Sequence, residues 1–155
     1  MNTPNMTDRQ NAASGESIST DQTHPKPPPQ YHPTRIIIEA VPPEKMRLPA
    51  YHEPLCGDWF FNPGNGDLHI QIAAADIWDD EEAFLIALHE TIEARLCFKA
   101  GVTQGAVDTF DSQFTGDGEP GDDPKAPYRD QHRAAMLIEH MMAWFLGKRD
   151  YGDVR

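Results

Sequence analysis

Histidine and glutamate side chains stand in the middle of an apolar stretch that is typical of a buried helix. Residues 83–98 read AFLIALHETIEARLCF, and this run contains His89, Glu90 and Glu93. His89 and Glu93 are four residues apart, so a helix presents both on one face. A carboxylate buried among apolar side chains is costly unless it is paired or bound to a metal ion. The stretch therefore predicts a buried site in which these side chains bind a cation or each other.

The last predicted helix, at about residues 128–146, repeats this pattern. Its second half is apolar except for Glu139 and His140, and His132 lies two helical turns before Glu139 on nearly the same face. If the two polar stripes face each other, four side chains converge: His89, Glu93, His132 and Glu139. Imidazole nitrogens and carboxylate oxygens are ligands for Zn²⁺ and for other first-row divalent ions. The sequence therefore predicts a metal site built from these four residues.

A metal-free network of hydrogen bonds is the alternative for the same residues. Buried histidine and glutamate side chains can satisfy each other, and Arg95, Arg129 or Arg133 can neutralise a glutamate. Cys97 lies one helical turn beyond Glu93, but a free buried cysteine usually behaves as a small hydrophobic side chain. We therefore assign it no ligand role, and the choice between metal and network stays open.

The string His89-Glu90-Thr91-Ile92-Glu93 resembles the HExxH active helix of the zincin metallopeptidases. Strands followed by such a helix, over about residues 58–100, are also similar to a minimal zincin. In those enzymes the two histidines bind zinc and the glutamate between them is the general base. The resemblance implies that His89 is the first zinc ligand and Glu90 the catalytic base. It also implies a hydrolase that acts on a peptide or another amide bond.

The chain departs from the zincin pattern at Glu93, which stands where the second histidine belongs. Glutamate is a competent zinc ligand, but a third ligand must come from elsewhere, and we assign it to His132. Glu139 is then either a fourth ligand or the acceptor that orients His132. A site with three protein ligands keeps a position open for water, as a catalytic site requires.

These residues must be positioned by elements whose order is strands first and helices after, which predicts an α+β fold. Strands are expected at residues 35–41, 58–61 and 67–73, with the last two as a hairpin across the turn-rich residues 62–66. Helices are expected from the N-cap Asp79 to about 100, near 104–110 and at about 128–146. The expected architecture is a small antiparallel sheet followed by two long packed helices. The spacing of apolar residues also predicts core positions in the last helix, namely Tyr128, Met141, Met142, Trp144 and Phe145.

Composition divides the chain of 155 residues into a leader and one domain. Residues 1–34 are polar and rich in proline, so they cannot bury enough apolar surface to offset the entropy of ordering. We expect a disordered leader there and a single domain over residues 35–155. Residues 108–123 contain acidic side chains and no basic ones, and their spacing does not fit an EF-hand loop, so we expect a solvated acidic loop.

The net charge of −12 argues against direct binding of nucleic acid, which needs a basic surface. No apolar run approaches the ~20 residues of a membrane helix, and the polar start does not resemble a secretory signal. Cys56 and Cys97 cannot form a disulfide scaffold, so a reduced cytoplasmic protein is expected. The oligomeric state is left open by the sequence.

Residues 119–129, EPGDDPKAPYR, followed by His132 and Glu139, resemble a group of small uncharacterised proteins encoded by bacteriophages and prophages. The resemblance implies action in the cytoplasm of an infected bacterium. It also supplies a second hypothesis, a non-catalytic acidic factor that binds a host protein. The histidines and glutamates would then form a structural metal site or a hydrogen-bond network.

Overall fold

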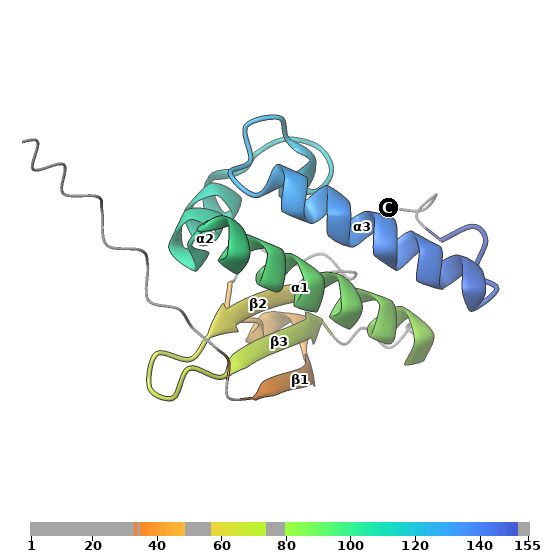
Figure 1. Ribbon diagram of the computed structural model, residues 1–155, viewed down its shortest axis with the longest axis horizontal. Coiled ribbons are helices and arrows are strands. Elements are labelled where there is room, and N and C mark those ends of the chain that lie inside the picture. Colours follow the sequence, from red (N-terminus) through yellow and green to blue (C-terminus); the bar gives the residue numbers. More distant parts are fainter. Residues whose placement is uncertain (1–32, 34, 49–56, 74–79, 152–155) are drawn as a thin grey trace, which may run out of the picture.

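The computed structural model describes residues 33, 35–48, 57–73 and 80–151. The predicted leader, apart from residue 33, lies outside these residues, as do Cys56 and the predicted N-cap Asp79. The elements in chain order are β1 (Ile36–Val41), the short 3₁₀ helix η1 (Pro43–Lys45), β2 (Gly57–Phe61), β3 (Leu68–Ala73), α1 (Asp80–Ala100), α2 (Gln104–Gln113), the 3₁₀ helix η2 (Pro120–Asp122) and α3 (Arg129–Phe145). Strands precede helices, so the predicted α+β class is confirmed (Figure 1). Among the described helices, none has the length and apolar character that a membrane span requires.

The sheet has the order β1–β3–β2 and is mixed. β2 and β3 form the predicted antiparallel hairpin, in which Trp59 lies opposite Ile70. β1 pairs with β3 in parallel, with Ile38 opposite Ile70, so the expectation of a wholly antiparallel sheet holds for the hairpin and not for β1. Parallel neighbours need a connection of about a dozen residues or more. Residues 42–67, which include β2, supply that connection.

The predicted alternation in β3 determines which face of the sheet is covered. Leu68, Ile70 and Ile72 are buried, whereas His69 and Gln71 on the other face are only half-buried. α1 packs on the buried face and lies between the sheet and α3 (Figure 1). Its buried apolar side chains join the strand residues in one core, which includes Ile86, Ala94 and Cys97. Cys97 is therefore a core residue, as expected.

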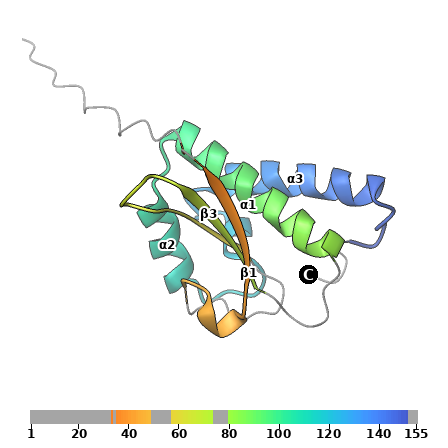
Figure 2. The same cartoon turned by 90° about the horizontal axis from the view of Figure 1, so that it is seen from below.

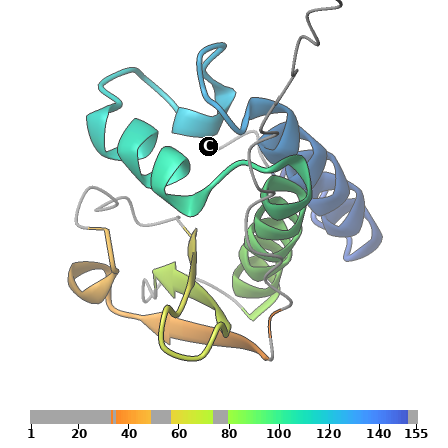
Figure 3. The ribbon, with the colours of Figure 1, turned by 60° about the vertical axis from the view of Figure 1, so that its left-hand side comes forward.

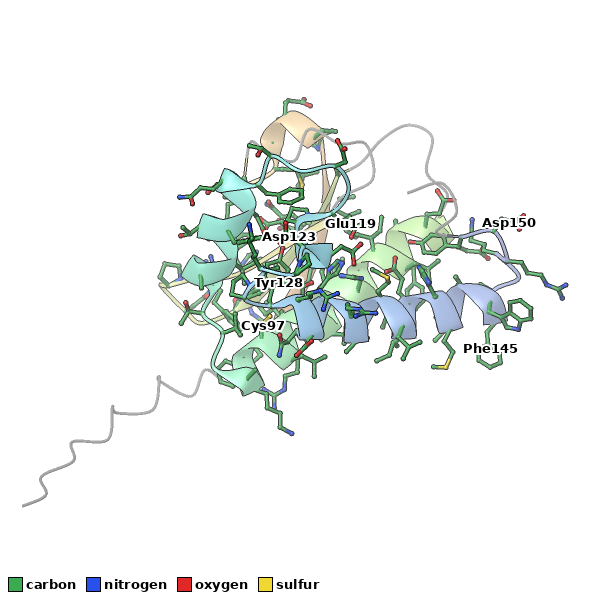
Figure 4. All side chains as sticks on the ribbon, turned by 90° about the horizontal axis from the view of Figure 1, so that it is seen from above. Cys97, Glu119, Asp123, Tyr128, Phe145 and Asp150 are labelled. Carbon is green, nitrogen blue, oxygen red and sulfur yellow. The ribbon has the colours of Figure 1, made fainter. Side chains whose placement is uncertain are left out.

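α1 and α3 lie side by side and run in opposite directions (Figures 2 and 3). The stripe of α3 that is buried consists of small and polar residues: His132, Ala135, Glu139 and Ala143. Because this stripe faces α1, the large apolar side chains of α3 lie on the opposite face. Trp144 is 60% exposed and Phe145 is 77% exposed, and Phe145 points away from the helix pair (Figure 4).

The prediction of core positions in α3 is therefore wrong for three residues and correct for Tyr128. Met141, Trp144 and Phe145 are exposed, Met142 is half-buried, and Tyr128, just before the helix, is buried. Apolar spacing alone suggested that the apolar face of the helix packs inward. In the structure, partners for the buried histidine and glutamate lie on α1, and this determines which face of α3 turns inward.

The acidic segment 108–123 is only partly a solvated loop. Its first residues belong to α2, which begins after Thr103, whose hydroxyl accepts a hydrogen bond from the Ala106 amide. Asp108 forms an ion pair with Arg47, whose guanidinium also binds Asp58. Asp111 is buried and accepts a 2.5 Å hydrogen bond from the Tyr128 hydroxyl. The expectation of free acidic side chains is therefore wrong for both aspartates, because each has a partner distant in sequence.

Candidate metal centre

The structure brings together the four residues that the sequence singled out on two helices. α1 contributes His89 and Glu93, and α3 contributes His132 and Glu139. All four are buried, and Glu139 is 0% exposed. The antiparallel packing of α1 and α3 places the two polar stripes against each other. The four side chains thus form one buried polar cluster between the helices.

Three donor atoms in this cluster form a compact triangle. His89 Nε2 lies 3.2 Å from His132 Nδ1 and 3.4 Å from Glu93 Oε2. Glu93 Oε2 lies 3.0 Å from His132 Nδ1. Ligands about 2.0–2.1 Å from a tetrahedral zinc ion lie about 3.3 Å from one another. The spacing of the three atoms therefore matches one face of a tetrahedral coordination site, and these three residues are the group in the described chain that could hold a metal ion.

Glu139 lies behind the triangle rather than at one of its corners. Its Oε2 atom is 2.8 Å from His89 Nδ1, and its Oε1 atom accepts a 2.6 Å hydrogen bond from the Tyr151 hydroxyl. When Glu139 accepts a hydrogen bond from the Nδ1–H group of neutral His89, the lone pair of His89 is on Nε2, the atom in the triangle. The role of Glu139 as a fourth ligand, or as the acceptor that orients His132, stays a prediction. Glu139 contacts His89, because α3 runs antiparallel to α1.

Two further residues that sequence analysis missed contact the triangle from other elements. The Trp59 indole on β2 donates a 2.9 Å hydrogen bond to Glu93 Oε1. Glu119, next to η2, has its Oε2 atom 3.3 Å from His132 Nε2, although the two groups are not aligned for a hydrogen bond. Figure 4 shows Glu119 near the start of α3. A Cβ on Gly121 would lie 2.3 Å from His132 Cγ, so only glycine fits beside this ring.

Glu90 lies on the side of α1 that faces β2. Its carboxyl group approaches Gly57 so closely that a Cβ there would lie 2.5 Å from Glu90 Oε1. Burial and the charge of Glu93 raise the pKa of Glu90 well above its usual value. A carboxyl group with a raised pKa takes up and releases protons nearer to neutral pH, as a general base or acid must. A raised pKa suits a general base, and the role of Glu90 as that base stays a prediction.

Opposing charges within the cluster hold His89, His132 and Glu93 in their ionised forms. Burial alone would lower the pKa of His89, but the bonds to Glu139 and Glu93 outweigh burial and raise it to about 11. Burial would likewise lower the pKa of His132, but the proximity of Glu119 and the bond to Glu93 raise it to about 9. Burial would raise the pKa of Glu93, and the two histidines instead lower it to about 2. Without a metal, imidazolium groups therefore pair with carboxylates.

The arginines considered as alternative partners lie elsewhere in the described structure. Arg95 lies over the Phe98 ring, and Arg129 donates to the Asp122 carbonyl. Arg133 is exposed. The positive charge opposite the buried glutamates therefore comes from the histidines, either as protons on their rings or as a metal ion between them.

The raised histidine pKa values predict how the chelated protein responds to pH. Each histidine has a higher pKa in the folded protein than the value of 6.5 for the unfolded chain. The stability that its charged form contributes is therefore complete below pH 6.5. It is lost as the pH rises through about 9 for His132 and about 11 for His89. Chelated protein is therefore expected to melt at a lower temperature near pH 10 than near pH 7, whereas zinc-loaded protein should change less because the ion replaces the protons. Thermal denaturation of both forms across this range is the measurement, and an unchanged melting temperature of chelated protein would contradict the prediction.

The cluster thus combines a histidine–glutamate–histidine triangle, a carboxylate and an indole that fix two of its members, and a nearby carboxyl group with a raised pKa. Such a set can bind a divalent ion and move a proton beside it. Comparisons with protein-family models, with curated proteins and with solved structures found no match to this chain.

Proposed function

We propose that this protein is a zincin-like metal-dependent hydrolase that holds a divalent ion between α1 and α3. His89, Glu93 and His132 would be the ligands, and zinc is the first choice among the first-row divalent ions. The observation that carries the proposal is the triangle of donor atoms, with sides of 3.0, 3.2 and 3.4 Å. Three protein ligands and a position left for water are typical of catalytic rather than structural zinc sites.

The surrounding side chains support this assignment because each fixes one ligand. Glu139 accepts from His89 Nδ1, and the Trp59 indole holds the second oxygen of Glu93. Partners of this kind set the tautomer and orientation of metal-binding side chains. The triangle is therefore held in shape before any ion enters.

Glu90 is the proposed general base. A zinc ion in such a site lowers the pKa of a bound water toward ~7. Glu90 lies on the same helix as two of the ligands, and its raised pKa would suit it to accept a proton during hydrolysis and to return it to the leaving group. The resemblance to zincins gives the substrate class, a peptide or another amide bond. The resemblance to phage proteins gives the proposed setting, the cytoplasm of an infected bacterium.

A non-catalytic role is the second candidate, and the burial of the cluster favours it. His89, Glu93 and His132 are each at most 5% exposed, which suits a site that fastens two helices together. With a net charge of −12, such a protein would act by binding a host protein through its acidic surface. Both candidates include the same metal ligands. The difference between them is whether Glu90 takes part in a reaction.

Incubation with a peptide library tests the proposed activity. Zinc-loaded protein, chelated protein and the Glu90→Gln variant are compared by mass spectrometry of the peptides after quenching. Cleavage by the zinc-loaded wild type alone would support the hydrolase. Normal metal binding and folding with no cleavage in any sample would favour the structural metal site instead.

A further inference from the structure

The chain beyond α3 turns back and places a tyrosine against the buried metal cluster. Gly147 has a φ of 84°, a left-handed conformation that suits glycine at the end of a helix. The Lys148 amide then donates to the Ala143 carbonyl at 2.9 Å, which closes the turn. In Figure 4 this end of the chain, marked by Asp150, lies beside the helix pair at the end opposite to Glu119. Tyr151 is thereby brought to the side of Glu139 that faces away from the triangle.

A continuous chain of short contacts connects Tyr151 to the proposed metal ligands. The Tyr151 hydroxyl donates to Glu139 Oε1 at 2.6 Å, and Glu139 Oε2 lies 2.8 Å from His89 Nδ1. His89 Nε2 is a corner of the donor triangle. Because Glu139 is 0% exposed, solvent cannot replace the hydroxyl as a partner while the side chains keep this arrangement.

An ion pair fastens the same segment to the start of α1. Lys148 Nζ lies 3.3 Å from Glu82 Oε1 and 4.0 Å from Glu81 Oε2. α1 also carries His89, so the segment contacts this helix at its first turn and, through Glu139, at its centre. We call residues 147–151 the C-terminal clasp.

We propose that Tyr151 is a positioning residue for the metal site, and that the C-terminal clasp and metal binding stabilise each other. This inference rests on the proposed metal site and concerns its regulation. By fixing one oxygen of Glu139, Tyr151 directs the other oxygen to His89 Nδ1, which leaves Nε2 free to bind the ion. Coupling between two binding events is reciprocal. Whatever docks the clasp therefore tightens metal binding, and metal binding holds the clasp in place.

Replacing Tyr151 with phenylalanine tests the first half of the proposal. The Tyr151→Phe variant keeps the ring and removes only the hydroxyl. We expect zinc affinity, measured by competition with a chromogenic chelator, to fall by ~10-fold or more, since loss of such an outer partner typically costs 10–100-fold. Loading with Co²⁺ adds a readout of ligand geometry, because its visible absorption spectrum should shift when His89 is no longer held. A purely structural tyrosine would leave that spectrum unchanged.

Tyr128→Phe is the matched control. Tyr128 also donates a short hydrogen bond to a buried carboxylate, Asp111. Its ring packs edge-on against His132, and phenylalanine keeps that ring contact, so the variant removes only the bond to Asp111. Loss of the Tyr128 hydroxyl should leave the zinc affinity and the cobalt spectrum close to those of the wild type. Equal losses in both variants would show general destabilisation and would overturn the positioning role.

Proteolysis of the wild-type protein tests the reciprocal half without any variant. Arg149 is exposed, and cleavage after it by trypsin releases Tyr151 from the domain. Zinc is expected to slow this cleavage ~10-fold relative to chelated protein, the reciprocal of its effect on affinity. Equal cleavage rates, or wild-type affinity in Tyr151→Phe, would overturn the inference while leaving the metal site intact. A wild type that binds no zinc would overturn the proposed function, and the inference with it.

Discussion

Glu90→Gln is expected to leave metal content at the wild-type level and to lower hydrolysis by ~10²–10⁴-fold, the usual cost of losing a general base. Glutamine has nearly the shape of glutamate and fits the same space beside Gly57, but it cannot accept a proton at neutral pH. Because Glu90 has a raised pKa from burial and from Glu93, the neutral amide should not harm the fold. The measurements are metal per chain by mass spectrometry and the rate of peptide cleavage by zinc-loaded protein.

Glu93→Gln is the partner experiment and should have the opposite profile. Glu93 Oε2 lies within 3.4 Å of both histidine donor atoms, so an amide there is a poorer ligand and metal affinity should fall. Glu90 and Glu93 are three residues apart on α1. The two variants therefore test the same change, from a carboxylate to an amide, at neighbouring positions. Loss of metal from Glu90→Gln with retention in Glu93→Gln would reverse the assigned roles and remove the support for the zincin analogy.

The second large effect is expected when either histidine of the triangle is replaced by alanine. His89→Ala and His132→Ala should each reduce zinc to below ~0.1 ion per chain, because either change leaves two of three ligands. His89→Ala also leaves the buried Glu139 carboxylate without its imidazole partner, so this variant should lose more stability than His132→Ala. Binding is measured by dialysis against zinc, and stability by thermal denaturation with chelator present.

His140→Ala is the control for the histidine variants. His140 lies on the same helix next to Glu139, but it is exposed, and its ring packs against Tyr151. Because this contact lies in the C-terminal clasp, the removal of His140 should lower zinc affinity no more than Tyr151→Phe does, and far less than His132→Ala does. If His140→Ala lost zinc as completely as His132→Ala, the ligands would not be those of the buried triangle.

The sequence predicted much of the fold because the main signals are local. Alternation identified β3, the turn after Phe61 identified the hairpin, and Gly101 and Gly147 marked the ends of two helices. The parallel pairing of β1 with β3 could not be predicted, because strand order depends on contacts between residues far apart in sequence. The inward face of α3 was also misjudged, since apolar spacing indicates which side chains share a face but not which face the partner helix covers.

Helical spacing predicted which residues of the site share a helix face, but not the contacts between different elements. Spacing placed His89 with Glu93 and His132 with Glu139, and the structure brings the two pairs together. Spacing could not show that Glu139 contacts His89, because the offset between two antiparallel helices is set by packing. No pattern in the sequence indicated Trp59 or Tyr151, because each contacts the cluster from a part of the chain outside the two polar stripes.

In the proposed metal site, protons and a metal ion would compete for the same donor atoms. In the metal-free form, the histidines are charged and pair with Glu93 and Glu139. Two imidazolium rings whose nitrogens lie 3.2 Å apart repel each other, although the carboxylates offset part of that repulsion. One divalent ion between the same nitrogens would remove this repulsion and would bind all three donor atoms at once.

Elemental analysis of wild-type protein, purified without a metal-affinity tag, tests the proposed metal site most directly. We expect about one zinc ion, or another first-row divalent ion, per chain. We also expect that chelation lowers the melting temperature and that returning zinc restores it, because an ion that binds only the folded form stabilises it. Metal-free protein whose melting temperature is unaffected by chelator or by added zinc would contradict the proposal, and would show that the histidines and glutamates form a hydrogen-bond network instead.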